Sequence, residues 1–111
     1  MKIGDLIEEL NLKCVTTYVE KDKTISGAYT SDLLSDVIAN SAKDNIWITL
    51  QTHLNIIAVT KLKELSAVLI VLNKPVEKEI IEKADAEEVS ILTTDMNAFR
   101  ISGKLYELGI R

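Results

Sequence analysis

The stretch NIWITLQTHLNIIAVTKLKEL, residues 45–65, contains an apolar strand, a short polar segment and an apolar helix in succession. Residues 46–50 are β-branched or large at every position and show no polar alternation, which is typical of a strand buried on both faces. The polar segment 51–53 interrupts this run. Apolar residues then recur with helical spacing and cover most of the circumference, which predicts a well-covered helix over residues 55–65. We expect the chain to fold around this unit.

A second apolar run, residues 67–72, has the same character as residues 46–50. Two such strands joined by a helix favour a right-handed parallel βαβ unit in which both strands are central neighbours and the helix crosses on one face. The expected fold is α/β, a layered α/β/α domain with a largely parallel or mixed central sheet and helices on both faces.

The other elements follow from periodicity and from capping residues. We expect helices over residues 4–11, over residues that follow Ser31 and Asp32, from Pro75 with an inward Ile80 and a Glu79–Lys83 ion pair, and after Thr94 and Asp95 with Phe99 inward, ending at Gly109. We expect further strands over residues 13–19, 25–30 and 89–93.

Composition indicates a single domain over residues 1–111 that is 47% hydrophobic and 27% charged, near the averages for globular proteins. No apolar run reaches the roughly 18 residues that a membrane helix needs, and the N-terminus turns acidic too soon for a signal peptide. Cys14 is the only cysteine, which agrees with a reducing compartment, and we expect it to be a small packed side chain. The predicted location is cytoplasmic.

Charge and motif content exclude several classes of function. Thirteen basic and seventeen acidic residues give a net charge of −4, so neither nucleic acid nor a membrane surface is an expected partner. One histidine and one cysteine without paired spacing predict no metal site, and no cofactor is expected. The segment Ser102-Gly103-Lys104 lacks the preceding glycine and the following Ser/Thr of a phosphate-binding loop, because Ala98 and Leu105 stand there.

Polar residues follow each expected parallel strand, and the carboxyl ends of such strands form one rim where ligands bind. Their donors, acceptors and exposed helix N-termini suit a small anionic metabolite. The candidate ligand-binding residues are Ser31, Asp32, Gln51, Thr52, His53, Asn73, Thr94 and Asp95.

Helix capping is the competing interpretation for Ser31 or Asp32, for Thr52, and for Thr94 or Asp95. His53 with Gln51 is the stronger functional candidate, because a helix entrance needs one cap and has no need of an imidazole. No catalytic residue is predicted, since no spacing selects Ser31, His53 and Asp95 as a nucleophile, base and orienting group.

The segment DKTISGAYTSDLLSDV, residues 22–37, followed by WITLQTH, residues 47–53, resembles the DRTGG domain family over essentially the whole chain. The positions of the name-giving Asp, Arg, Thr, Gly and Gly are occupied by Asp22, Lys23, Ser26, Gly27 and Ala28. Lys23 and Ala28 depart from the pattern, which brings into question any role that needs a planar guanidinium or a positive-φ glycine there.

The resemblance implies an α/β layered domain with a mixed sheet, similar to the N-terminal domain of HPr kinase/phosphorylase, to a middle module of phosphotransacetylases and to modules beside CBS pairs. The catalytic parts of those proteins lie elsewhere, so the resemblance implies no activity that could be transferred.

We therefore expect a non-catalytic binding or regulatory module that senses a small anionic ligand or self-associates, as a homodimer. The alternatives are a protein-interaction subunit without a small ligand, and an enzyme that acts on phosphoester or acyl-phosphate groups. Trp47 is expected in the core. If its edge reached the surface, it would be a natural anchor for a self-interface.

Overall fold

Five strands form one mixed sheet in the computed structural model, which describes residues 1–111. Their spatial order is β1-β5-β4-β3-β2. Neighbours among β2 to β5 are parallel, and β1 runs antiparallel to β5. The strands are β1 (Lys13–Cys14), β2 (Gly27–Thr30), β3 (Asn45–Thr49), β4 (Ala67–Ile70) and β5 (Ile91–Thr93).

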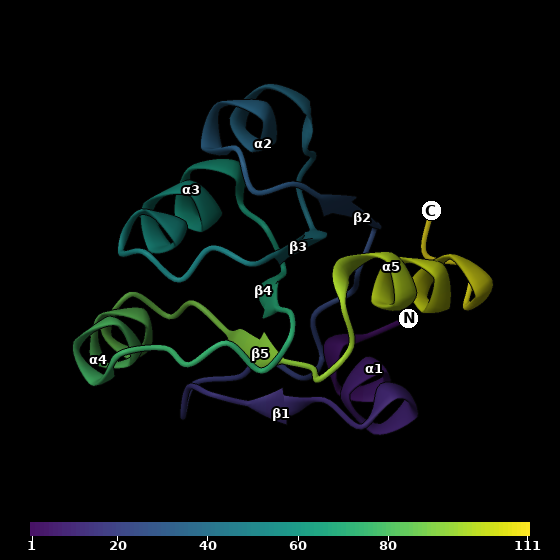
Figure 1. The fold of residues 1–111 in the computed structure, drawn as a ribbon, viewed down its shortest axis with the longest axis horizontal. Helices are drawn as coiled ribbons and strands as arrows, with labels where there is room; N and C mark the ends of the chain where they lie inside the picture. The colour runs from purple at the N-terminus through teal and green to yellow at the C-terminus, as the bar shows by residue number, and fades with distance from the viewer.

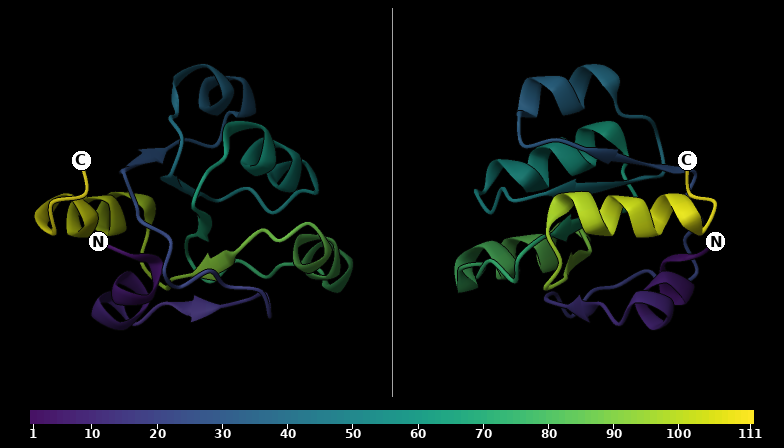
Figure 2. Two further views of the ribbon diagram at one scale, coloured as in Figure 1. Left: turned by 180° about the vertical axis from the view of Figure 1, so that it is seen from behind. Right: turned by 45° about the vertical axis from the view of Figure 1, so that its right-hand side comes forward.

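Helices cover both faces of this sheet, so the domain has the expected three α/β/α layers (Figure 1). The buried residues of three helices enter one core and those of the other two enter the second core. Both chain termini lie on the side of the second group (Figure 2). The first group is α2 (Leu34–Asn40), α3 (Asn55–Lys63) and α4 (Lys78–Ala86), and the second is α1 (Ile3–Leu10) and α5 (Ala98–Glu107).

The two central strands are neighbours, as the βαβ pattern predicts. Strand β3 pairs in parallel with β4, Thr49 opposite Ile70, and α3 crosses between them. Successive residues of each strand enter opposite cores because side chains alternate across a sheet. Ile46 and Ile48 pack on the side of α1 and α5, whereas Trp47 and Ile70 pack on the side of α2, α3 and α4. All are fully buried, each contributing roughly 1.5–3 kcal/mol or more.

The predicted strand over residues 13–19 is wrong beyond Cys14. The Thr16 hydroxyl donates to the Tyr18 carbonyl at 2.7 Å and accepts from the Ile91 N–H at 3.1 Å, so a side chain replaces the backbone ladder there. The prediction that Cys14 is packed is also wrong. Both residues of the short edge strand β1 are exposed.

The predicted helix starts also differ from the structure. Helix α2 has Leu33 as its N-cap and α5 has Asn97, whose Oδ1 accepts from the Arg100 N–H at 2.9 Å. Pro75 lies outside α4, which begins at Lys78. A cap preference fixes a start only to within a few residues, because neighbouring Ser, Asp or Asn can also bond locally in a loop.

Three side-chain predictions on the helices are wrong as well. Lys83 pairs with Glu87 at 3.4 Å rather than with Glu79. Phe99 is 86% exposed, because it lies roughly opposite the buried Ile101 on α5. The third is the prediction that the helix over residues 55–65 is covered around most of its circumference, because Leu62 is 67% exposed on the outer side of α3.

The predicted strand over residues 67–72 ends early, at Ile70. Leu72 and Asn73 have φ angles of 58° and 47°, which no strand accommodates. Strand β2 likewise begins at Gly27 rather than Ile25. No helix in the structure combines the length and the apolar character that crossing a membrane would require.

Candidate functional site

The carboxyl ends of β2, β3, β4 and β5 lie at one edge of the sheet because these strands are parallel neighbours. We call this edge the rim, and it comprises residues 31–33, 50–54, 71–74 and 94–97. Every residue of the predicted site lies in one of these four segments.

Asp32 joins two rim segments. Its Oδ1 accepts from the Thr49 hydroxyl at 2.8 Å and from the Leu50 N–H at 2.7 Å. The Gln51 side-chain amide donates to the Asp32 carbonyl at 3.0 Å. Asp32 therefore caps no helix, and its carboxylate fixes the loop after β3 against the loop after β2.

Two adjoining hollows open on the rim, with volumes of about 690 and about 220 Å³. They share two lining residues, Gln51 and Lys74. The larger is lined by Gln51, Thr52, His53, Leu54, Lys74, Glu77, Glu79, Ile80 and Lys83, and the smaller by Asp32, Leu50, Gln51 and Lys74.

Lys74 is the cation at the junction of these hollows, and its ammonium group forms no ion pair, whereas Lys83 pairs with Glu87. A tight turn places it there: the Lys74 N–H donates to the Val71 carbonyl at 3.3 Å. The two residues between them have left-handed backbone and donate their N–H groups to the carbonyls of Met96 and Thr94, at 3.0 and 2.8 Å. The turn is thus anchored to the loop after β5.

His53 lies at the entrance of α3 with an exposed ring. Its Nδ1 accepts from the Asn55 N–H at 3.2 Å, while the N-cap residue Leu54 provides no side-chain bond. The neutral ring therefore carries its proton on Nε2, which is available to a ligand in the larger hollow. The cap bond therefore uses Nδ1 and leaves Nε2 without a partner in the protein.

The remaining predicted residues line neither hollow. The Ser31 and Thr94 hydroxyl oxygens accept from N–H groups two residues ahead, at 3.2 Å each. Asn73 and Asp95 are exposed. Ser31, His53 and Asp95 share no hydrogen bond with one another, so the structure shows no catalytic arrangement of these three. No cluster of His, Cys, Asp or Glu is arranged to hold a metal ion.

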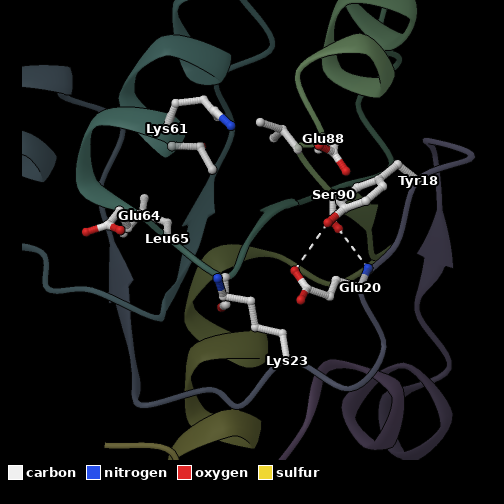
Figure 3. A pocket seen from close by; sticks show the side chains of 11 residues that line it. Tyr18, Glu20, Lys23, Lys61, Glu64, Leu65, Glu88 and Ser90 are labelled. Carbon is white, nitrogen blue, oxygen red and sulfur yellow. Dashed lines mark hydrogen bonds between the residues drawn. The ribbon is translucent and has the colours of Figure 1, made fainter.

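A third hollow, of about 270 Å³, lies at the opposite edge, where β4 and β5 begin (Figure 3). We call it the strand-start hollow. It is lined by Tyr18, Glu20, Lys23, Thr60, Lys61, Glu64, Leu65, Ser66, Glu88, Val89 and Ser90. The Tyr18 hydroxyl donates to Glu20 Oε2 at 3.2 Å, and the Glu20 N–H donates to Ser90 Oγ at 3.3 Å. Burial, and then the charge of Glu20, raise the pKa of Tyr18.

Comparison with models of known protein families gave no match, and comparison with curated proteins gave none either. Among solved structures, a similar chain contains the CBS and DRTGG domains of the regulatory region of Clostridium perfringens pyrophosphatase, complexed with the activator diadenosine tetraphosphate. The TM-score is 0.74 at 16% identity, and the match covers 92% of this chain. The chain has a DRTGG-like fold. The fold that the DRTGG resemblance implied is thereby confirmed.

The likeness is one of fold, and this DRTGG-like chain spans 44% of the pyrophosphatase chain that it matches. The nucleotide activator is a ligand of that regulatory region, which also contains CBS domains.

The DRTGG-like signature holds strand starts together. The Ser26 hydroxyl donates to the Lys43 carbonyl at 2.7 Å and accepts from the Asn45 side-chain amide at 3.2 Å. A Cβ on Gly27 would come within 3.1 Å of the Asn45 amide nitrogen, so only glycine fits without displacement. These residues brace the edge opposite the rim.

The other signature residues differ in exposure. Lys23 lies 3.5 Å from Asp44 and reaches the strand-start hollow. Asp22 is exposed, and Ala28 packs at the margin of the core beneath α1 and α5.

Proposed function

We propose that this DRTGG-like domain is a non-catalytic regulatory module that binds a small anionic ligand at the rim. The observation that carries the proposal is the unpaired ammonium group of Lys74 where two hollows meet. A lysine that several turn bonds hold beside a hollow, without a carboxylate partner, suits an anion supplied from solution.

Neighbouring groups support the same ligand chemistry. His53 offers Nε2–H as a donor to the larger hollow, because its Nδ1 already accepts from the Asn55 N–H. The Thr52 hydroxyl lines the same hollow and forms no hydrogen bond within the protein. Glu77 and Glu79 line it too and repel an anion, so the ligand should bind at the end where Gln51 and Lys74 lie.

The similar regulatory region adds support at the level of ligand class. It binds diadenosine tetraphosphate, which is a small and strongly anionic metabolite. A regulatory rather than catalytic role for the present domain agrees with that neighbour. The cytoplasmic location expected from the sequence is part of the same proposal.

Calorimetric titration with sulfate tests the rim, because sulfate is a small anion of the proposed class. His53→Ala should weaken binding severalfold, because it removes the Nε2–H donor. It should lower the melting temperature only slightly, because one cap bond is worth about 1 kcal/mol. Lys74→Gln should weaken binding roughly tenfold, which corresponds to about 1.4 kcal/mol.

Lys78→Gln is the matched control, because Lys78 is an exposed lysine nearby that lines no hollow. Equal loss of affinity in Lys74→Gln and Lys78→Gln would contradict a site at the rim. Turnover of a phosphoester or acyl-phosphate that His53→Ala abolishes would replace the proposal with the enzyme alternative. A stoichiometric protein partner, with no response to any metabolite, would favour the interaction subunit.

Self-association is a second candidate function, and exposed apolar side chains on adjacent helices favour it. Helices α2 and α3 pack side by side, and Leu33, Ile38 and Leu62 on or beside them are exposed. Trp47 is fully buried and donates its Nε1–H to the Ser31 carbonyl at 2.8 Å, so it cannot anchor an interface. Light scattering should give twice the mass of one chain, and Leu62→Glu should return it to that of a monomer.

A further inference from the structure

Opposite charges face each other across the strand-start hollow without pairing (Figure 3). The ammonium groups of Lys61 and Lys23 lie on one side, and the carboxylates of Glu20 and Glu88 lie on the other. No ion pair crosses the space, since the only partner of Lys23 is Asp44 and Lys61 has none. Glu64 belongs to the lining, but its carboxylate points away. The hollow therefore has a basic wall and an acidic wall.

Backbone charge reinforces the acidic wall. Helix α4 ends at Ala86, just before Glu88, and helix C-termini carry partial negative charge. Glu20 and Glu88 both act to raise the pKa of the Tyr18 hydroxyl, after the larger effect of burial. The two carboxylates thus make the potential beside Tyr18 negative.

A buried hydroxyl provides a further donor. Ser90 is 3% exposed, and its Oγ accepts from the Glu20 N–H at 3.3 Å, while no bond in the structure uses its own proton. That proton is available to a ligand in the hollow.

We propose that the strand-start hollow binds a small zwitterion of the free α-amino acid class. The ligand ammonium group lies against Glu20 and Glu88, and its carboxylate lies against Lys61 and Lys23. The volume of about 270 Å³ falls just below the roughly 300–1,000 Å³ of typical ligand pockets, which suits a molecule smaller than a nucleotide. A simple cation or a simple anion would leave one wall unmatched. The strand-start hollow shares no lining residue with the two rim hollows, so this proposal does not depend on the rim proposal.

Calorimetric titration of the whole chain with each of the free amino acids that occur in proteins, one at a time, tests this proposal. At least one should bind saturably, and its α-amide and its des-amino acid should bind at least tenfold more weakly, because each lacks one of the two charges. If no amino acid binds at millimolar concentration, or if either single-charge analogue binds as well as the amino acid, the proposal is wrong.

Two glutamates form a matched pair for locating the site. Glu64 and Glu88 both follow helices, have φ angles of 53° and 58°, and line this hollow, but only Glu88 points into it. Glu88→Gln and Lys61→Gln should each weaken the amino acid about tenfold, and Glu64→Gln should leave its affinity unchanged. Equal effects of Glu64→Gln and Glu88→Gln would place the ligand elsewhere. Urea midpoints near that of the wild type verify that each variant folds.

Discussion

The rim and the strand-start hollow occupy opposite ends of the same sheet and use their polar side chains differently. At the rim, Asp32, Ser31 and Thr94 are engaged in bonds to nearby backbone, which leaves Lys74 as the unpaired cation. At the strand-start hollow, several charges remain unpaired. The comparison shows that the sequence position of a polar residue determines where in the fold it lies. Its local hydrogen bonds determine whether its side chain has groups left for a ligand.

The largest loss of stability is expected from a charge placed in β4, the central strand that connects the rim with the strand-start hollow. Ile70, the last residue of β4, is fully buried between β3 and β5. Ile70→Asp should lower the free energy of unfolding by several kcal/mol, on the order of 3–5, because it leaves an uncompensated buried charge. Urea denaturation measures this loss.

Leu72→Asp is the control, two residues further on, where the side chain is 55% exposed. It should leave the urea midpoint close to that of the wild type. If Ile70→Asp were equally mild, β4 could not be the buried centre that separates the two ends.

The next effect compares two aspartates of the rim. Asp32→Ala should destabilise by about 1–3 kcal/mol, because the nearly buried Thr49 hydroxyl loses its acceptor. Asp95→Ala, which removes an exposed carboxylate, should change stability by less than about 0.5 kcal/mol. Equal thermal shifts would show that Asp32 has no structural role beyond that of an ordinary surface residue.

A smaller gain is expected at the turn that carries Lys74. Leu72 has a φ angle of 58°, a conformation that costs roughly 1–2 kcal/mol for an L-residue. Glycine avoids this cost but loses about 0.5–1 kcal/mol more conformational entropy on folding. Leu72→Gly should therefore stabilise the domain by up to about 1 kcal/mol in urea melts. Leu72→Ala keeps the backbone penalty, so a gain as large in alanine would point to the side chain instead.

The smallest effect concerns acid stability. The Tyr29 hydroxyl donates to Asp36 Oδ1 at 2.6 Å, and this bond is the main reason why the pKa of Asp36 lies below its ordinary 3.8. Because the folded-state pKa is lowered, the stabilisation from Asp36 is present above about pH 3.8 and is lost as pH falls through the folded pKa. Tyr29→Phe should raise the pKa of Asp36 in a carboxyl NMR titration and reduce this acid dependence. An unchanged pKa would assign the shift to Ser31 and Asn40.

Much of the fold could be predicted from the sequence because two apolar runs have one physical solution. Residues 46–50 and 67–72 need cover on both faces, and a helix between them leads to parallel pairing. Helix starts were less predictable, since Ser31, Asp32 and Thr94 all have side chains suited to capping but bond within loops instead. A side-chain oxygen can accept from an N–H group of a helix or of a loop, and only the tertiary structure decides which of the two it contacts.

The candidate sites were predictable in part. The larger rim hollow is lined by Gln51, Thr52 and His53, which the sequence placed at the carboxyl end of a buried strand. Lys74 was missed, although a lysine directly after Asn73 and a buried strand was a usable signal. The strand-start hollow draws on segments from Tyr18 to Ser90, and no local pattern predicts such an assembly.

One contact at the start of β2 bears on how this domain could be joined to others. The Met1 carbonyl accepts from the Ile25 N–H at 2.9 Å, and the Arg111 carbonyl lies against Gly27, so both chain ends contact the same short segment. Figure 2 shows the two ends on one side of the molecule. A fold whose entrance and exit are adjacent can be inserted into a surface loop of a host protein without spreading that loop.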